Sequence, residues 1–507
     1  MIAKISTFKL NGIEAVPVTV ECEVTSGIGI HLVGLADQAV KESLLRIVTA
    51  LQAIGYRIPG KKVVINLAPA DLHKKGSGYD LPIAISIIAA SGQEELPDLD
   101  KYVLAGELGL DGSLRDIPGW LQIAELANKS GKCCILPRES AKLAARALHG
   151  EVTIYGADGL KEVIDILNNG APERTALDEV MDDSEMDVEA FDYFYDWWNA
   201  TPGHDAEKRA LEIAAAGGHP ILLIGVPGSE KQALAKSMLS ILPPMSAEEA
   251  MDVQRIYSAA DRRIVPDVRP FREISSIPSM SALLGGGLGD NIAPGAVSLA
   301  HAGILYIDQL SDMPKSLLEG MRGPLEDSKV TISRLRNKVD YPAKFFPVFA
   351  SNPCPCGYYG DGDRCTCTLG QRVAYLARLS GPVSDRLTMQ VWTHPNQPGA
   401  TLGEPSQIVA ERVRKARERQ IERQGKLNDE LNATEAEEAC GISGEYGGED
   451  IFNAVEELIS KLNLSFRAYS RTLKIARTIA DLEGSEQIQK QHLTEAVSFR
   501  FLDRRKF

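Results

Sequence analysis

Hydrophobic and polar positions follow alternating strand-like and helix-like periods along the first third of the chain. Residues 15–25 alternate like a half-buried strand, and residues 61–69 predict a second one. Residues 37–55 carry a helical period that stops at a glycine, and residues 78–92 predict a buried helix that ends in the same way. Further strand and helix signals follow, so the pattern predicts an α/β domain over residues 1–170.

The alternation resumes over residues 195–395. Within this range, residues 302–310 and 343–353 are apolar runs followed by loops, which is typical of buried strands in a parallel sheet. The pattern therefore predicts an α/β fold class, with a second α/β domain built on a parallel sheet.

Residues 396–507 predict helices alone, and hence a helical C-terminal domain. Residues 406–424 form a basic amphipathic pattern, residues 448–484 predict two more helices, and residues 489–503 predict a last one. Six arginines and lysines within residues 411–424 could face DNA in a channel. Three glutamates dilute their field, so a solvated helix face is favoured.

Residues 171–194 separate the two α/β parts. They carry nine acidic residues against one arginine. This composition predicts a linker with a solvated acidic stretch, and an acidic interaction segment is the alternative.

Length and charge limit the class of protein. A chain of 507 residues is too long for one core, so several domains are expected. The net charge of −14 argues against broad affinity for nucleic acid but leaves room for a local basic channel. The apolar runs are too short to span a bilayer and the N-terminus lacks a signal-peptide pattern, so we expect a cytoplasmic protein without a membrane partner.

The segment ILLIGVPGSEKQALAKS, residues 221–237, has the strand, glycine turn and helix that a phosphate-binding loop requires. Such a loop wraps backbone N–H groups around phosphates, and its lysine contacts the β- and γ-phosphates. The residues that keep this framework are Gly225, Pro227, Gly228, Ser229 and Lys231.

Two positions depart from the phosphate-binding pattern G-x-x-x-x-G-K-[ST]. Glu230 replaces the second glycine and is expected to place a carboxylate where polyphosphate would sit. Gln232 replaces the Ser or Thr whose hydroxyl ligates Mg²⁺. The loop alone is a weak signal, and an ordinary strand–turn–helix crossover is the alternative.

Two further strand ends add candidate chemistry. The apolar strand ILYI leads into Asp308, the place from which an Asp holds Mg²⁺ in ATPases of this type. The next residue, normally a glutamate that polarises water, is Gln309, whose amide cannot accept a proton. Asn352 follows another predicted strand and could sense a γ-phosphate and position water. The alternatives are a capping Asp after a core strand and a plain Asn-Pro turn.

Several motifs stand in one order along the chain: EIAAAGGHPILLIGVPG, SILPPM, RPFR, PGAVSLAHAGILYIDQL, GPLEDSKVTISR, SNPCPCGYYGD, LSGPVSDR and LNLSFRAYSRTLKIARTIADLEG. Together they resemble the YifB/ComM family of magnesium-chelatase-like AAA+ proteins. The N-terminal stretch PGKKVVINLAPADLHKKGSGYDLPIAI resembles the Lon-protease-like domain of that family. The resemblance implies a Lon-like N-terminal domain, an AAA+ core and a helical lid.

The resemblance also implies an activity. Members of the family form rings, usually hexamers, with ATP and Mg²⁺ between subunits, and ComM-type members are helicases that drive DNA branch migration in natural transformation. Carried over, Lys231 would hold phosphates, Asp308 would hold Mg²⁺, and Asn352 would be the sensor. Arg386 matches the arginine finger for a neighbouring nucleotide, and Arg467 matches the second sensor of the lid. The alternative for each arginine is a surface ion pair.

The departures from the family pattern lie mainly at chemical positions, namely Glu230, Gln232 and Gln309. In addition, residues 273–279, EISSIPS, replace a segment in which the family carries two histidines. We therefore expect a ring-forming member, alone or mixed with an intact paralogue, that acts with DNA but hydrolyses ATP poorly or not at all. An active ATP-driven DNA motor and a nucleotide-free scaffold are the alternatives.

Two C-x-C pairs with eight residues between them form a second candidate site. Four thiolates on one loop suit tetrahedral Zn²⁺, and two reduced thiol pairs are the alternative. The residues are Cys354, Cys356, Cys365 and Cys367.

The Lon-like resemblance raises the question of a peptidase, because Lon proteases use a Ser–Lys dyad. Ser77 is the nearest serine, with Lys74 and Lys75 close by. The local sequence does not reproduce the protease motif, so we do not expect peptidase activity.

Overall fold

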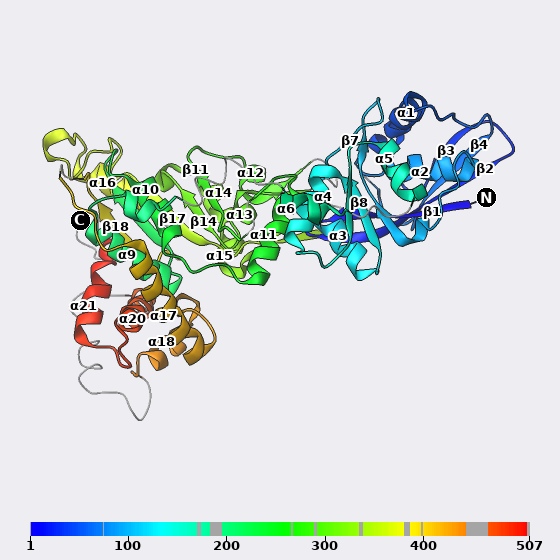
Figure 1. Ribbon diagram of the computed structural model, residues 1–507. Coiled ribbons are helices and arrows are strands. Elements are labelled where there is room, and N and C mark those ends of the chain that lie inside the picture. Colours follow the sequence, from blue (N-terminus) through cyan, green and yellow to red (C-terminus); the bar gives the residue numbers. More distant parts are fainter. Residues whose placement is uncertain are drawn as a thin grey trace.

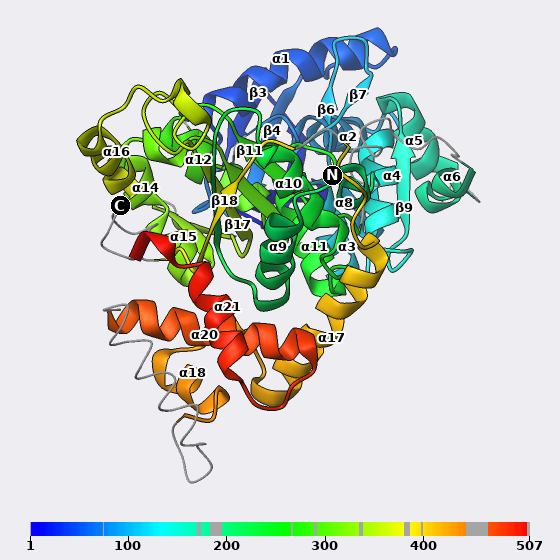
Figure 2. The same cartoon turned by 90° about the vertical axis from the view of Figure 1, so that its left-hand side faces the viewer.

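The computed structural model describes residues 2–74, 76–169, 174–182, 195–264, 267–287, 292–333, 338–379, 386–396, 399–442 and 465–503. The molecule is elongated, with an N-terminal sheet at one end and a parallel sheet toward the other (Figure 1). A helical C-terminal part lies beside the parallel sheet, below it in Figure 2. The predicted fold class, an α/β protein with a parallel sheet and a helical C-terminal part, is confirmed.

The N-terminal part is built on a seven-stranded sheet of order β3-β4-β2-β1-β5-β8-β9. Its strands are β1 (Ile2–Asn11), β2 (Glu14–Thr25), β3 (Gly29–Val33), β4 (Lys62–Ala68), β5 (Tyr102–Leu104), β8 (Cys133–Pro137) and β9 (Ile154–Ala157). β2 pairs antiparallel with β1 and with β4, whereas β5, β8 and β9 join in parallel. β2 and β4 are the two strands that the pattern predicts.

The helices of this part are α1 (Gln38–Ala53), α2 (Asp80–Ser91), α3 (Trp120–Lys129), α4 (Arg138–Ala147) and α5 (Leu160–Asn169). α2 packs against β1, β2 and α1, which explains why its sequence is apolar on nearly every side. Gly92 ends α2 in the left-handed region, at φ 68°. A short hairpin of β6 (Glu107–Leu108) and β7 (Leu114–Arg115) stands apart from the main sheet.

The acidic segment, residues 171–194, contains a helix where we predicted only a linker. α6 (Ala176–Asp182) packs against α4, and Arg138 pairs with Glu179 at 2.5 Å. Ala176 is buried in the same contact. The pattern hid this helix because it is only seven residues long and stands in an acidic stretch, and the rest of the segment lies largely outside the described residues.

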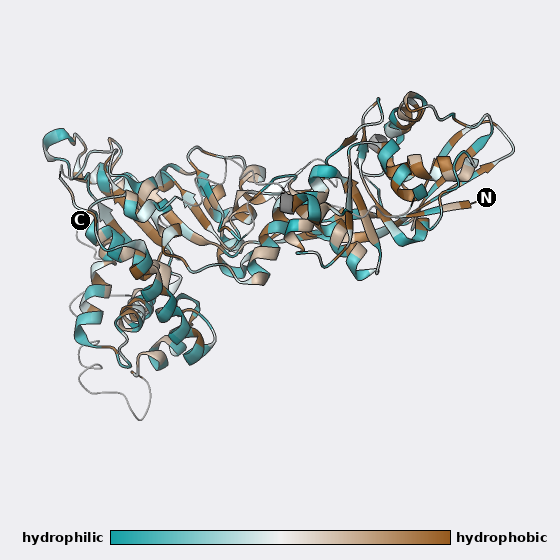
Figure 3. Cartoon of the chain, viewed as in Figure 1, coloured by the Kyte–Doolittle hydropathy of each residue, from teal (hydrophilic) through white to brown (hydrophobic). Residues whose placement is uncertain are grey.

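The second sheet is parallel throughout, with the order β11-β14-β17-β10-β18. Its strands are β10 (Ile221–Gly225), β11 (Phe271–Ile274), β14 (Ile304–Ile307), β17 (Phe346–Ser351) and β18 (Met389–Thr393). The central strands are buried on both faces and read as continuous apolar runs. In Figure 3 the strands of this sheet are coloured brown for hydrophobic residues, whereas the C-terminal helical part is largely teal for hydrophilic ones.

Helices and small hairpins surround the parallel sheet. The helices are α8 (Trp197–Ala200), α9 (Asp205–Gly217), α10 (Lys231–Ser237), α11 (Ala247–Ala259), α12 (Met280–Leu284), α13 (Ala296–Leu299), α14 (Lys315–Gly320), α15 (Arg322–Asp327) and α16 (Leu369–Leu376). The hairpins pair β12 (Gly285–Gly286) with β13 (Ala293–Pro294), and β15 (Lys329–Ser333) with β16 (Lys338–Pro342). α11 joins this part to α3, since Gly119 N donates to Ser258 O at 2.9 Å.

The C-terminal helices are α17 (Ser406–Gln424), α18 (Ala433–Ala439), α20 (Phe466–Glu483) and α21 (Lys490–Ser498). α20 is the second helix predicted within residues 448–484, and the first falls outside the described residues. α17 and α20 share one buried core with α9 and β10, so the helical part is firmly attached to the sheet. Among the described residues, no helix is both long and apolar enough to cross a membrane.

The arginines of α17 are engaged within the molecule, which argues against the DNA-channel alternative for this helix. Arg412 pairs with Glu404 at 2.6 Å, Arg414 pairs with Glu411 at 2.7 Å, and Arg423 pairs with Asp481 at 2.7 Å. Two more arginines donate to backbone carbonyls of α9 and α20. The solvated helix face is therefore the better interpretation.

Candidate functional site

Three of the predicted site residues lie at one edge of the parallel sheet. Gly225 ends β10, Asp308 follows β14, and Asn352 follows β17. β17 pairs in parallel with both β10 and β14, so the carboxyl ends of the three strands share an edge. Ligands of open α/β sheets bind outside the carboxyl ends of the strands. We call this the carboxyl edge.

The loop after β10 is tightly built on one side and open on the other. A side chain at Gly225 would collide with Thr393 and with Ser229. Ser229 is fully buried, and its hydroxyl lies 2.8 Å from Thr393 Oγ1 and donates to Val226 O at 2.8 Å. Gly228, at φ 84°, has no atom within 4 Å of the place where a Cβ would stand. Open space therefore exists beside Gly228, while Ser229 holds the loop in shape with a hydroxyl that is already bonded.

Lys231 begins α10 and folds back over this loop. Its ammonium donates to Gly225 O at 2.8 Å, to Val226 O at 3.0 Å and to Ser229 Oγ at 3.3 Å. Burial lowers the pKa of Lys231, and the carboxylate of Asp308 opposes that shift. The ammonium of Lys231 thus shares its protons among acceptors of the loop itself.

Glu230 does not extend its carboxylate into the phosphate position, contrary to the expectation from the pattern. Its backbone is left-handed, at φ 54°, the conformation for which the family pattern has glycine. This geometry turns the side chain toward His204, and the Oε2 atom lies 2.9 Å from His204 Nε2. Hydrogen bonds to Glu207 and to Glu230 raise the pKa of His204. Glu230 therefore ties the loop to the start of α9.

Gln232 contacts an acid that no motif singled out as its partner. Its side-chain amide donates to the carboxylate of Glu273, which belongs to β11. Glu273 stands opposite Tyr306 in the β11–β14 pairing, and Asp308 lies two residues after Tyr306 on the neighbouring strand. Burial raises the pKa of Tyr306 well above its usual range, and Asp308 and Glu273 add to that shift. This side of the carboxyl edge therefore holds the carboxylates of Glu273 and Asp308 and the amide of Gln232.

Gln309 and Asn352 border the same edge. Gln309 is exposed and left-handed at φ 50°, and its backbone N–H donates to Asp308 Oδ1 at 2.9 Å. Asn352 lies beside the turn that contains Gly357. The structure thus brings together the residues predicted for phosphate, Mg²⁺ and water.

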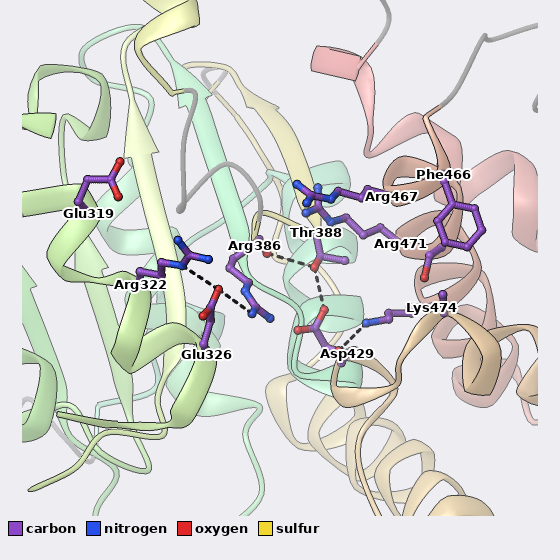
Figure 4. Close-up of a pocket in the computed structure, with 12 residues that line it drawn as sticks. Glu319, Arg322, Glu326, Arg386, Thr388, Asp429, Phe466, Arg467, Arg471 and Lys474 are labelled. Atoms are coloured by element: carbon purple, nitrogen blue, oxygen red, sulfur yellow. Dashed lines mark hydrogen bonds and ion pairs between the residues drawn. The ribbon is translucent and has the colours of Figure 1, made fainter. Parts of the chain in front are cut away.

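The two predicted arginines lie elsewhere, in a polar cavity of about 560 Å³ between α14, α15 and α20 (Figure 4). Arg386 pairs with Glu326 at 3.2 Å, and Arg467 reaches the cavity from α20. Burial lowers the pKa of Lys474 on the same helix. The cavity's charged residues are Glu319, Arg322, Glu326, Arg386, Asp429, Arg467, Arg471 and Lys474. Arg386 and Arg467 line the same cavity, and Lys231 is not among the residues that line it.

The four cysteines form a compact group, which we call the four-cysteine cluster. Its members are Cys354, Cys356, Cys365 and Cys367. Their sulfur atoms all lie within 4.8 Å of one another. The sulfur of Cys354 is 3.3 Å from that of Cys356 and 3.8 Å from that of Cys365, and the sulfurs of Cys356 and Cys365 are 3.7 Å apart. A disulfide has sulfur atoms about 2.05 Å apart, so these are free thiols in an arrangement compatible with a metal ion.

Ser77 and Lys74, the residues considered for a Ser–Lys dyad, do not pair with each other. The Ser77 hydroxyl donates to Glu107, and the ammonium of Lys74 donates to Pro69 O. Lys75 lies outside the described residues. Each side chain is engaged with a different partner, and the absence of peptidase activity stays a prediction.

Comparison with known proteins defines the class of the chain. Family models for the magnesium chelatase subunit ChlI match residues 20–140 and 198–401, and the model for the C-terminal part of that subunit matches residues 403–500. The matched residues include the whole parallel sheet, the helical part and most strands of the N-terminal sheet, but not β1 or β9. The chain is therefore a magnesium-chelatase-like protein.

Curated relatives narrow this class. YifB of Salmonella typhimurium is 40% identical over 97% of this chain and 96% of its own, and YifB of Escherichia coli is also 40% identical with the same coverage. Competence protein ComM of Haemophilus influenzae is 38% identical over 97% of this chain and 96% of its own. The chain belongs to the YifB/ComM family of magnesium-chelatase-like proteins.

Proposed function

We propose that this chain is a ring-forming AAA+ protein that binds a magnesium nucleotide at the carboxyl edge and hydrolyses it slowly or not at all. The residues at that edge fit such a ligand. Open space lies beside Gly228, and the first N–H groups of α10 have no partner within the helix. Lys231 folds back over the loop, so it would contact phosphate, and Asp308 would hold Mg²⁺. The bound Mg²⁺ would neutralise charge on the β- and γ-phosphates.

The observation that carries impaired hydrolysis is the contact between Gln232 and Glu273. It occupies the position at which a hydroxyl would ligate Mg²⁺, and it adds a carboxylate on that side. Gln309, next to Asp308, can hydrogen-bond a water molecule but cannot take its proton. Binding without efficient turnover is therefore the expected chemistry.

Arg386 and Arg467 are proposed to serve the nucleotide of a neighbouring subunit. Arg386 precedes β18 and Gly225 ends β10, and these strands run parallel with Met389 opposite Ile221. Arg386 therefore lies beyond the amino end of these strands, and Gly225 lies at their carboxyl end. The two ends are four residues apart along the strand, or roughly 13 Å, and the flanking loops add to this distance. The cavity of Figure 4 therefore suits a ring in which it meets the next subunit's phosphate-binding loop.

A role on DNA is proposed from kinship with a competence protein, and branch migration in natural transformation is the process that the resemblance implies. The net charge of −14 confines such contact to a local surface. A nucleotide-free scaffold is the second candidate function. The observation that favours it is the set of three internal acceptors around the ammonium of Lys231.

Zn²⁺ is proposed as the ion of the four-cysteine cluster. A Zn–S distance of about 2.3 Å places the sulfur atoms of a tetrahedral site about 3.8 Å apart. The sulfur–sulfur distances among Cys354, Cys356 and Cys365, 3.3 to 3.8 Å, are close to that value. Four protein ligands leave no open position, so the ion would be structural and not catalytic.

Assembly tests the proposal that the arginines act on a neighbour. We expect the Arg386→Ala chain to bind ATP as a dilute monomer like the unchanged protein, but to lose nucleotide-dependent assembly in sedimentation velocity. Arg378→Ala is the control, because Arg378 is exposed, pairs with Asp312 at 3.6 Å and does not line the cavity. Weaker ATP binding by the Arg386→Ala monomer would instead place this arginine at its own subunit's nucleotide.

A further inference from the structure

The four-cysteine cluster lies against the phosphate-binding loop, and this contact links the two candidate sites. We propose that Zn²⁺ in the cluster fixes the position of residues 226–230, so that the metal is a structural part of the nucleotide site. The inference rests on the proposed zinc and nucleotide sites and adds a dependence of one on the other. It also makes a statement about the loop that can be tested without any nucleotide.

The contact begins where β17 ends. Cys354 is fully buried two residues after Asn352, and Gly357 N donates to Cys354 O at 2.9 Å, which closes a tight turn. Gly357 has φ 86°, a conformation that only glycine adopts readily. The first C-x-C pair therefore sits in a turn that continues directly from the carboxyl edge.

This turn forms one wall of the phosphate-binding loop. The place of a Cβ on Gly357 is 3.4 Å from two ring carbons of Pro227 and 3.9 Å from Asn352 Cγ. A methyl group at position 357 would thus be in van der Waals contact with the proline ring, so the turn faces Pro227 across a narrow gap. Any shift of the turn changes the support of Pro227, which stands next to the open space beside Gly228.

The outer half of the cysteine loop is held by aromatic contacts to the same strands. The Tyr359 ring lies 6.3 Å from the Trp392 ring, and Arg372 lies 4.2 Å from the centre of Tyr359. Trp392 is on β18 directly opposite Ile224 of β10. The loop is thus anchored on both sides of the strand that leads into the phosphate-binding loop.

Little else orders the loop between the two C-x-C pairs. Its regular structure is a single 3₁₀ turn, Gly362–Arg364, and its backbone hydrogen bonds are local, as from Asp361 N to Tyr358 O at 3.1 Å. Four metal–sulfur bonds would supply the missing constraint, as in other structural zinc sites. Loss of the metal should therefore release the turn at Gly357 and, through it, the wall against Pro227.

Hydrogen exchange on the full-length protein tests the inference directly. The zinc-loaded and chelator-stripped chains are compared by mass spectrometry, with β1 and β2 as internal controls. We expect exchange at residues 226–237 to rise by about tenfold or more after stripping, while the control strands keep their rates. Faster exchange confined to residues 354–367, or a chain that never binds zinc, would overturn the inference.

A variant on the loop side keeps the test independent of metal removal. Pro227→Ala removes the ring carbons that touch the turn and leaves every thiol in place. Zinc transfer to the chromogenic chelator 4-(2-pyridylazo)resorcinol should then become several-fold faster, because coupling between two sites is reciprocal. Pro314→Ala, an exposed proline at the start of α14, is the control, and equal rates in Pro227→Ala and the unchanged chain would refute the coupling.

ATP binding separates failure of this inference from failure of the proposed function. If the loop responds to zinc but neither form binds ATP, the nucleotide function fails and the metal–loop coupling stands. If both forms bind ATP with equal affinity and the loop exchanges at equal rates, the coupling fails and the nucleotide function stands.

Discussion

The triple variant Glu230→Gly, Gln232→Thr and Gln309→Glu is expected to hydrolyse ATP at least about 10²-fold faster than the unchanged chain. Each change restores one chemical task at the carboxyl edge. Glycine at position 230 relieves the left-handed strain, threonine at 232 offers Mg²⁺ a hydroxyl, and glutamate at 309 can accept a proton from water. Phosphate release with saturating ATP and Mg²⁺ is the measurement.

The lysine variant is the matched control for this gain. Adding Lys231→Ala to the triple variant should return phosphate release to the background, because Lys231 is the group that would contact phosphate. A second comparison adds Glu273→Gln, because threonine at 232 cannot donate the hydrogen bond that the Gln232 amide gives to the Glu273 carboxylate. If the triple variant, with or without this change, stays at the rate of the unchanged chain, the three substitutions are not the cause of impaired hydrolysis.

Asp481→Ala is expected to destabilise the helical C-terminal part by about 3–5 kcal/mol, because it leaves the buried guanidinium of Arg477 without its partner. The Asp481 side chain is 1% exposed and accepts from Arg477 Nη2 at 2.9 Å and from Arg423 Nη1 at 2.7 Å. Asn428 Nδ2 donates to its other oxygen at 2.9 Å. One carboxylate therefore joins α17, α20 and the connection between α17 and α18. Urea unfolding followed by circular dichroism measures the loss.

Glu411→Ala is the control for the buried carboxylate. Glu411 also pairs with an arginine of α17, Arg414, but both side chains are about half exposed. Exposed ion pairs are screened by water and contribute little, so a much smaller loss is expected. Equal losses in the Asp481→Ala and Glu411→Ala chains would show that burial of the ion network is not what stabilises this part.

The carboxyl edge could be predicted from the sequence because it depends on local signals. Apolar runs located β10, β14 and β17, of which β14 leads into Asp308, β17 leads into Asn352 and β10 leads into the glycine turn before Lys231. Parallel strands necessarily bring their carboxyl ends together. The family resemblance then supplied the role of each residue.

Contacts between distant segments were not accessible in this way. Gln232 and Glu273 are 41 positions apart, and nothing in either motif announces that amide and carboxylate meet. The direction of Glu230 depends on its backbone angle and on His204, neither of which has a sequence signal. The same holds for Gly357 and Pro227, whose contact exists only because β17 and β10 are neighbours in the sheet.

The position of the arginines follows from strand order. The motif around Arg386 suggests a role at a nucleotide, but only the pairing of β18 with β10 places it at the opposite edge from Lys231. A sequence motif specifies which residue types are present, whereas the sheet decides whether they can meet within one chain. We therefore predict that Arg386 and Arg467 act on the nucleotide of a neighbouring subunit and not on that of their own.

Binding and turnover of ATP, measured on the same purified full-length sample with Mg²⁺, test the central claim most directly. The account predicts saturable binding of a fluorescent ATP analogue that is lost in the Lys231→Ala chain, together with phosphate release at the background rate. Robust phosphate release that disappears in Lys231→Ala would contradict impaired hydrolysis and identify an active motor. Absence of binding in the unchanged chain would contradict the nucleotide site itself and leave the scaffold.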